Sequence, residues 1–337
     1  MAHDSSMNLS QRLALDQLQA WEALGYGLFL HFGMTTFDGV ENNLGENPST
    51  VYTPDRLDVG QWIGIARDAG MKYAILTTKH VSGHCLWPSR HTDYHVGTSG
   101  NKTDVVAEFV EACRQRGLKT GLYYCSWDNH HKLGSVTPSM TQWEYAFASR
   151  EYQEFMWRQL DELMDGYGAI DEWWIDIPGV LPRDYRHRLY AHIAGRQPSS
   201  MIVMNHGISD GTILKVDYAW PTDAMVIERC LPNNVTYKPP VISHSQYQRV
   251  REVEGKRYYI PGEVCDPIGR DWFCVEDDCP RSDAELLGMY LVSRSRGANF
   301  LLDVGPDKHG LIHNQDREAL MRLRKNIDKL EIHEDKK

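Results

Sequence analysis

One sequence pattern occurs twice, in Asp68–Leu76 (DAGMKYAIL) and in Gln115–Tyr124 (QRGLKTGLYY). In each, an amphipathic stretch ends at a glycine, a lysine follows two residues later, and an apolar run comes next. A glycine in this place is typical of the C-terminus of a helix, and the run that follows is typical of a buried strand. The repeat therefore predicts helix–strand units joined by tight turns.

The same alternation extends along the chain. Strands are expected at Tyr26–Met34, Lys72–His80, Lys119–Trp127, Glu172–Asp176, Met201–Asn205, Ala224–Cys230, Arg257–Cys265 and Asn299–Gly305. Helices are expected near 58–69, 105–113, 141–167, 184–194 and 283–296, whereas the helix between the sixth and seventh strands (231–256) is poorly marked. Apolar strands separated by helices indicate a parallel sheet covered on both faces. Eight of them favour a closed (β/α)8 barrel over an open doubly wound sheet.

We therefore predict an α/β protein with one catalytic barrel domain over residues 1–337. An N-terminal helix is expected at about 8–23, the barrel at about 25–312 and a C-terminal helix at about 314–332. No GxGxxG follows the first strand and no GxxxxGK[ST] is present, so the sequence offers no support for a nucleotide site.

The composition narrows the possible partners. The chain has 337 residues, 42% of them hydrophobic and 24% charged, with a net charge of −10. An acidic chain argues against nucleic acid or anionic lipid as a partner, and no apolar run reaches the roughly 18 residues of a membrane span. Seven scattered cysteines without a CxxC pair argue against disulfides and a structural zinc, and the first residues lack a signal-peptide core. A cytoplasmic location is expected, and the oligomeric state stays open.

Polar side chains mark the carboxyl ends of the expected strands, where barrels of this kind carry their chemistry. In chain order they are His31, Lys79 with His80, Tyr124 with Trp127, Asp176, Asn205 with His206, Glu228, Glu263 and Asp303. Any one of these residues could simply mark the end of a strand, but polar residues at eight successive strand ends indicate a functional site.

Two carboxylates stand out among these strand ends. Asp176 closes the bulky apolar run WWID, and Glu228 lies within VIERC, beside Arg229. Asp176 could instead be a capping carboxylate before Pro178, and Glu228 could form a buried ion pair with Arg229. Two carboxylates that face one cavity are what glycoside hydrolysis requires, and aromatic neighbours suit the faces of sugar rings.

Six motifs in order resemble the α-L-fucosidases of glycoside hydrolase family 29. They are GYGLFLHFG, YAILTTKH with SGHCLWPSRHTDY, GLKTGLYYCSW, WWID, DYAWPTDAMVIE and GANFLLDVGPDKHGLI, and they span about residues 25–312. The resemblance implies a (β/α)8 barrel of retaining exo-glycosidases that needs no metal or organic cofactor. It also implies a fucosylated oligosaccharide or glycoconjugate as the substrate.

The resemblance also implies roles for individual residues. The aspartate of the fourth-strand motif is the family nucleophile and falls on Asp176. The acid/base varies in the family, and its nearest match is Glu228, with Glu263 as the runner-up. Substrate-binding roles are implied for His31, His80, Tyr124 and Trp174, and Trp127 at the end of the third strand is grouped with them.

The chain departs from the family pattern in three places. KHHDGF becomes KHVSGH, so Val81 replaces the second histidine and Ser82 the aspartate. The hydroxyl contact made by that histidine is then missing, unless His84 or a loop residue supplies it. Ile177 replaces the glycine that follows the nucleophile, and the usual C-terminal β-sandwich is not expected after Ile312. The first change leaves open whether the sugar is fucose or a related L-sugar such as an α-L-galactoside.

Two other functions compete with that of a retaining glycosidase. The 15 histidines, among them His80, His84, His130 and His131, raise the possibility of a metal-dependent hydrolase. Neither an HxH on the first strand nor an HExxH is present, so a catalytic metal is not expected. An inactive sugar-binding barrel is the other alternative. The presence of both candidate carboxylates argues against it.

Overall fold

The fold is a nearly closed parallel barrel surrounded by helices, seen in a computed structural model that describes residues 9–131, 147, 149–233 and 247–334. Its strands are β1 (Tyr26–Leu30), β2 (Tyr73–Lys79), β3 (Lys119–Cys125), β4 (Glu172–Asp176), β5 (Met201–Asn205), β6 (Met225–Glu228), β9 (Gly262–Pro267) and β10 (Ala298–Asp303). They pair in parallel in the order β5-β4-β3-β2-β1-β10-β9-β6. The predicted (β/α)8 barrel is confirmed.

The barrel closes between β5 and β6. The backbone N–H of Asp223, just before β6, donates to the carbonyl of Ile202 on β5 at 2.8 Å. The hydroxyl of Thr222 accepts from the N–H of Met204 at 3.0 Å. These two bonds join the edges of the sheet, so that all eight strands deliver their carboxyl ends to one rim.

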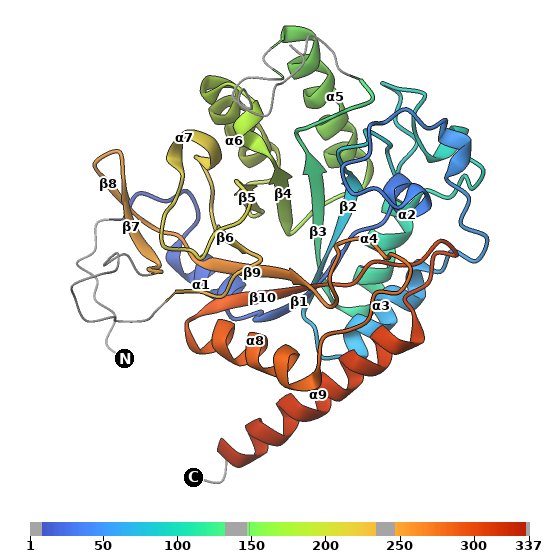
Figure 1. Ribbon diagram of the computed structural model, residues 1–337. Helices are drawn as coiled ribbons and strands as arrows, with labels where there is room; N and C mark the ends of the chain where they lie inside the picture. Colours follow the sequence, from blue (N-terminus) through green and yellow to red (C-terminus); the bar gives the residue numbers. More distant parts are fainter. Residues whose placement is uncertain (1–8, 132–146, 148, 234–246, 335–337) are drawn as a thin grey trace.

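Helices surround the barrel on its outside and at its two ends (Figure 1). They are α1 (Leu15–Glu22), α2 (Met34–Asp38), α3 (Val59–Asp68), α4 (Val105–Arg116), α5 (Arg150–Gly166), α6 (Arg183–Arg196), α7 (Val216–Ala219), α8 (Asp283–Ser295) and α9 (Asn314–Glu334). None of the helices in the described part of the chain is both long and apolar enough to cross a membrane.

Local sequence sets the ends of the two repeated helices. The side chain of Asp58 accepts the N–H of Gln61 at 2.8 Å before α3, and Asp104 accepts that of Ala107 at 2.9 Å before α4. These aspartates satisfy N–H groups that have no partner within the helix. Gly117 ends α4 with φ +70, a left-handed conformation that glycine adopts without a steric penalty. The predicted helix–glycine–strand unit is confirmed.

Two predicted strands differ from the structure. Arg257–Cys265 was expected to be one strand but is divided between β8 (Lys256–Tyr259), which forms an antiparallel hairpin with β7 (Val250–Val253), and the barrel strand β9. Pro261 stands at the break, and a proline cannot donate to a sheet ladder. The run from Tyr26 to Met34 is also too long, because β1 ends at Leu30 and Met34 begins α2.

The predicted helices lie close to the observed ones, with two boundary differences. The helix expected at about 141–167 begins, within the described residues, at Arg150, and 141–146 and 148 lie outside them. Similarly, α1 begins at Leu15 rather than near residue 8, which also lies outside the described residues.

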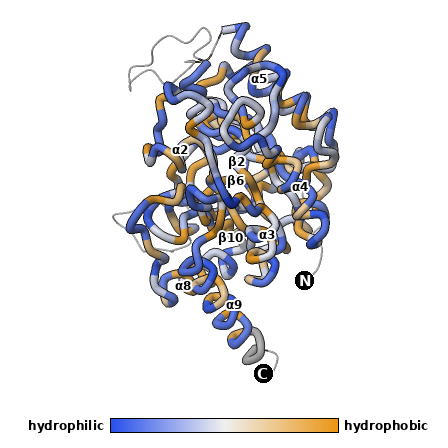
Figure 2. The backbone as a smooth tube through the Cα atoms, turned by 90° about the vertical axis from the view of Figure 1, so that its right-hand side faces the viewer, coloured by the Kyte–Doolittle hydropathy of each residue, from blue (hydrophilic) through white to orange (hydrophobic). Residues whose placement is uncertain are grey.

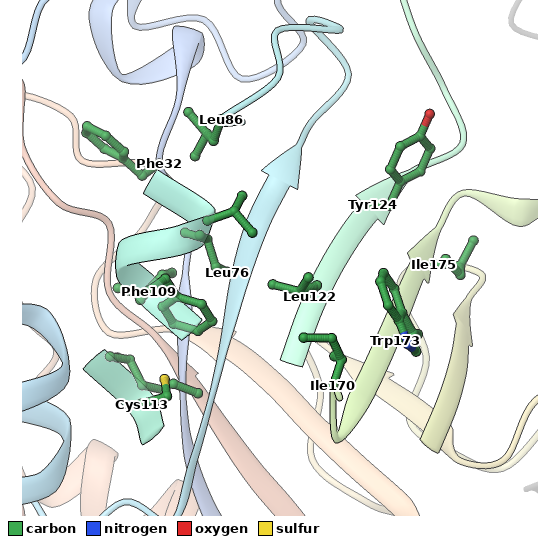
Figure 3. Close-up of a cluster of buried hydrophobic side chains, with 14 of the residues drawn as sticks. Phe32, Leu76, Leu86, Phe109, Cys113, Leu122, Tyr124, Ile170, Trp173 and Ile175 are labelled. Atoms are coloured by element: carbon green, nitrogen blue, oxygen red, sulfur yellow. The ribbon is translucent and has the colours of Figure 1, made fainter. Parts of the chain in front are cut away.

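The hydrophobic core has two large parts, beside a small cluster of Trp220, Met225, Val253 and Ile260. One lies between strands and helices, where Leu76 and Leu122 pack with Phe109 and Cys113 of α4 (Figure 3). The other fills the barrel and includes Trp21 of α1. In Figure 2 the hydrophobic residues concentrate on the central strands and the hydrophilic ones on the outer segments. This packing holds the strand ends rigidly, as a site built on them requires.

Candidate active site

A cavity of about 600 Å³ lies at the carboxyl ends of the strands. Its polar walls come from strand ends predicted to carry chemistry: His31, His80, Asp176, Asn205, His206 and Glu228. Its apolar walls include Phe29, Val81, Trp174 and Trp272. Glu41, Asn42, Lys215 and Tyr218 contribute from two loops, one after α2 and one around α7. The cavity thus gathers paired carboxylates, histidines and aromatic surfaces, a combination suited to a sugar.

Asp176, the last residue of β4, is held by two donors. The phenol of Tyr123 donates to Oδ2 at 2.6 Å, and Nδ2 of Asn205 donates to Oδ1 at 2.8 Å. Burial raises the pKa of Asp176, and these two hydrogen bonds act in the opposite direction. Bonds that donate to the carboxylate favour its charged form. Asp176 is therefore a fixed carboxylate with both oxygens oriented.

Glu228, at the end of β6, shares a donor with Asp176. The same Nδ2 of Asn205 donates to Oε2 of Glu228 at 2.7 Å. The amide oxygen of Asn205 accepts the N–H of Gly207 at 3.0 Å, which fixes the orientation of the amide. The distance between the nearest oxygens of the two carboxylates therefore cannot exceed the summed lengths of these two hydrogen bonds.

The environment of Glu228 favours its protonated form more than that of Asp176. Burial, followed by the neighbouring charge of Asp176, raises the pKa of Glu228 to about 7. The hydrogen bond from Asn205 and the charge of Arg229 partly oppose this rise. Two interacting acids in one cavity are thus separated into a carboxylate and a group that keeps its proton near neutral pH.

Both carboxylates are followed by a residue in the left-handed backbone region. Ile177 has φ +49 and Arg229 has φ +56. A residue other than glycine pays a steric cost there, and such positions gather at functional sites. The chain therefore turns sharply out of each strand immediately after the acid.

His31 and His80 line the cavity beside the two acids. Nδ1 of His31 is bonded to Oδ1 of Asp303 on β10 at 2.7 Å, which orients the ring. Burial lowers the pKa of His31 to about 3 and that of His80 well below its usual range. Nδ1 of His80 is buried without a partner among the described groups. Both rings are neutral at pH 7 and can bond to hydroxyl groups.

Aromatic rings form the floor and walls. The ring of Tyr123 is stacked between those of Trp174 and His80, at centroid distances of 5.4 and 5.7 Å. Phe29 packs edge-on against Trp174 at 5.1 Å, and Trp272 lies 5.1 Å from His31. These faces are the apolar surfaces on which the C–H face of a sugar ring packs.

The structure does not place Tyr124 in the cavity. Its side chain points outward into the core between strands and helices (Figure 3), and its hydroxyl donates to Gln159 of α5 at 2.7 Å. Side chains alternate along a strand, and the register pairs Tyr123 with Trp174. Tyr123 therefore takes the place near Asp176 that was expected for Tyr124.

Trp127 and His84 do not line the cavity either. The indole of Trp127 donates to Asn129 at 2.6 Å. Nε2 of His84 is bonded to Ser99 at 2.9 Å, and its ring packs against Tyr52 and Tyr94. His84 is thus engaged behind the cavity and does not supply the contact that Val81 cannot make.

Glu263, the runner-up for the acid/base, lies below the cavity, on the second residue of β9. Its oxygens accept the phenol of Tyr73 at 2.7 Å and the indole N–H of Trp174 at 3.0 Å. It is fully buried at the amino-terminal end of the barrel, on the far side of Trp174 from the cavity. This position leaves Glu228 as the glutamate that faces Asp176.

Several cavity residues had no clear signal in the sequence. Asn205 was noted only as a polar strand end, and Tyr123 was concealed by its tyrosine neighbour. Glu41, Asn42, Lys215, Tyr218 and Trp272 lie on loops or short turns, whose return to the cavity depends on tertiary structure. Among the described residues, no group of three or more His, Cys, Asp or Glu side chains could hold a metal ion.

Comparison with known proteins identifies the family. The family model for Alpha-L-fucosidase matches residues 4–329. Alpha-L-fucosidase 1 of Arabidopsis thaliana is 33% identical over 319 residues, which covers 90% of this chain and 58% of the relative. Putative alpha-L-fucosidase 1 of Oryza sativa subsp. japonica is 30% identical, covering 90% and 56%. The chain thus spans less than two thirds of the length of these plant relatives.

Solved structures agree on the fold. A putative alpha-L-fucosidase from Bacteroides thetaiotaomicron superposes with a TM-score of 0.75 at 30% identity, over 96% of this chain and 68% of that one. The alpha-L-fucosidase AlfC from Lactobacillus casei, solved with the product alpha-L-fucose, has a TM-score of 0.71 at 20% identity, over 94% and 99%. At that identity the second match shows the fold alone. From the family match over almost its whole length, we conclude that the chain belongs to the alpha-L-fucosidase family of glycoside hydrolases.

Proposed function

We propose that this chain hydrolyses α-L-fucosides with retention of configuration, using Asp176 as the nucleophile and Glu228 as the acid/base. The observation that carries the proposal is the single amide of Asn205 bonded to both carboxylates. It sets an upper limit on the separation of their nearest oxygens, and such closeness agrees with retaining glycosidases, whose carboxyl groups lie roughly 5–5.5 Å apart, rather than with inverting enzymes, which need about 6.5–9.5 Å for a water molecule.

In the first step Asp176 attacks C1 of the sugar while Glu228 gives its proton to the departing oxygen. A covalent glycosyl-enzyme forms, and the bond from C1 to the leaving oxygen breaks. In the second step Glu228, now ionised, takes a proton from water, and the oxygen of that water displaces Asp176 from C1. The raised pKa of Glu228, about 7, supports its role as the proton donor.

The rest of the cavity supports binding of one terminal sugar. His31, oriented by Asp303, and His80 are placed to bond hydroxyl groups. Trp174 and Phe29 offer an apolar surface to the ring and to the C6 methyl group of a 6-deoxy sugar. A fucosylated oligosaccharide or glycoconjugate is the substrate class that this arrangement suits.

A related α-L-glycoside is the second candidate, and one observation favours it. Val81 is buried and lines the cavity where the family motif KHHDGF has a second histidine. An aliphatic side chain there removes a hydrogen bond to the sugar, and a site that no longer pairs with a hydroxyl discriminates less between sugars.

The test is hydrolysis of an aryl α-L-fucoside beside its α-L-galactoside and β-D-galactoside analogues, with and without EDTA. We expect the fucoside to react most rapidly, without an effect of EDTA, and α-L-fucose to be the first anomer seen by proton NMR. A preference for the galactoside would support the second candidate. The β anomer as first product would contradict retention, and loss of activity in EDTA would indicate a metal.

A further inference from the structure

A second pair of acids lies inside the barrel beneath the cavity. Glu172 opens β4 and Glu263 lies near the start of β9, close enough for the charge of Glu263 to raise the pKa of Glu172. Both are buried, at 2% and 0% exposure. The reaction proposed above uses neither of them.

The donors around this pair are neutral. Trp21 of α1 donates its indole N–H to Oε2 of Glu172 at 2.7 Å. Tyr73 donates to Oε1 of Glu263 at 2.7 Å, and Trp174 donates to Oε2 of Glu263 at 3.0 Å. Two buried carboxylates in contact with each other repel strongly, and three neutral donors do not cancel two charges. One proton between the two acids removes this cost.

Hydrogen-bond requirements assign the proton to one side. Both oxygens of Glu263 already accept a bond, whereas Oε1 of Glu172 is buried and has no donor among the described groups. A protonated Glu172 donates to Glu263, which then stands as a carboxylate that accepts three bonds. Burial, and then the other acid, raise the pKa of Glu172 well above its usual range, in agreement with this assignment.

We propose that Glu172 and Glu263 share a single proton, held on Glu172, and that the pair fixes Trp174 at the floor of the cavity. Trp174 connects the two levels of the barrel, because its ring lines the cavity while its N–H reaches down to Glu263. Glu263 is thus a positioning residue that acts on the sugar through Trp174. Trp21 connects the same pair to α1, so this helix is coupled to the sugar site.

Other groups near the pair titrate outside the relevant range or act weakly. Burial and the charges of Glu263 and Glu172 raise the pKa of Tyr73 on β2. Burial and the charges of Glu228 and Glu263 raise the pKa of Cys265 on β9. Asp171, just before β4, adds a further negative charge, and Arg294 of α8 acts on Tyr73. None of these groups donates the proton that the pair Glu172–Glu263 shares at neutral pH.

The proton is tested with Glu172→Gln, a neutral side chain of the same shape as the protonated acid. Its amide oxygen can accept from Trp21, and its NH2 group can donate to Glu263. We expect the wild type to show an infrared carboxylic-acid band above pH 7 that this variant lacks. A band that is unchanged by the substitution would overturn the assignment of the proton. This readout does not require activity, so it stays valid if the proposed function fails.

The stability of the same variant gives a second readout. Folded Glu172 keeps a proton that the unfolded chain releases above about pH 4.3. Rising pH therefore favours the unfolded wild type, by up to tenfold per pH unit relative to Glu172→Gln. Parallel stability profiles for the two proteins would contradict the proposal.

The positioning role rests on the proposed function and is tested by kinetics. Glu263→Gln leaves one amide oxygen for Tyr73 and Trp174, which in the wild type donate to separate oxygens of Glu263. We therefore expect KM for an aryl α-L-fucoside to rise about tenfold, the size of one lost buried hydrogen bond. Adding Tyr73→Phe removes the competing donor, so the double variant should recover most of this loss. A double variant that is worse than the single one would overturn the role. These two variants also test the role of Glu263 in positioning Trp174 if Glu172→Gln does not fold.

Discussion

Asp176 and Glu228 accept hydrogen bonds from one nitrogen atom, Nδ2 of Asn205, at 2.8 and 2.7 Å. This shared donor fixes the spacing of the two acids and moderates the repulsion between them. Asp176 has the additional phenol of Tyr123, and the pKa of Glu228 is raised to about 7 by burial and by the charge of Asp176. Two similar side chains are thereby prepared for different parts of one reaction.

The pH profile should report this division. Because Glu228 must carry a proton to assist the leaving group, we expect kcat/KM to fall as pH rises through about 7, with a limiting slope of tenfold per pH unit. The profile is measured with a substrate whose leaving group needs protonation. Glu228→Gln should lack this alkaline limb, and a variant that keeps it would show that another group is titrating.

Removal of the shared amide should move the profile. In Asn205→Ala both acids lose a bond that lowers their pKa values, so the acidic and alkaline limbs should both shift upward, by roughly half to one pH unit. The measurement is the full kcat/KM profile of the variant beside the wild type. A downward shift of the alkaline limb would contradict the role assigned to Asn205.

Loss of the nucleophile should abolish turnover. We expect Asp176→Ala to lower kcat on an aryl α-L-fucoside by several orders of magnitude, because nucleophile and acid act as a unit. External azide, which can enter the space left by the carboxylate, should restore part of the rate and give β-L-fucosyl azide. Activity near that of the wild type without azide would remove Asp176 from the mechanism.

The two candidate glutamates can be separated by their leaving-group dependence. Glu228→Ala should impair substrates with poor leaving groups far more than activated aryl fucosides, because only the former need the proton. Glu263→Ala should show no such dependence, since Glu263 lies beneath Trp174 and does not line the cavity. If Glu263→Ala were the variant with the strong dependence, the assignment of the acid would be wrong.

Adjacent tyrosines provide a matched pair of variants. Tyr123→Phe removes the 2.6 Å bond to Asp176, and we expect kcat to fall by roughly ten- to a hundredfold. Tyr124→Phe removes only a bond to Gln159 outside the barrel, so stability should fall by about 1 kcal/mol while kcat/KM stays within about twofold. Thermal unfolding and steady-state kinetics on both proteins check this contrast.

Much of the fold could be predicted from sequence because each unit carries its own local signals. Asp58 and Asp104 cap their helices and Gly117 ends one, and strands such as β2 begin with an apolar run. The parallel arrangement then places every strand end on one rim, which brings His31 and Asp176 together without knowledge of side-chain packing. The division of the predicted strand Arg257–Cys265 was missed because Pro261, where the ladder breaks, was not treated as the end of a strand.

The remaining features of the site depend on register and on loops. Only the pairing of Tyr123 with Trp174 shows which of two neighbouring tyrosines faces inward. The positions of Glu41 and Lys215 depend on how two long connections return to the cavity. Such distant contacts leave no periodic pattern in the sequence.

The most direct test of the account is to trap the glycosyl-enzyme with a 2-deoxy-2-fluoro-α-L-fucosyl donor that has an activated leaving group. The protein is then digested, and the labelled peptide is sequenced by mass spectrometry. The account predicts one 2-fluorofucosyl group per chain, on the peptide that contains Asp176. A label on another carboxylate, or turnover of ordinary fucosides with β-L-fucose as the first product, would contradict it.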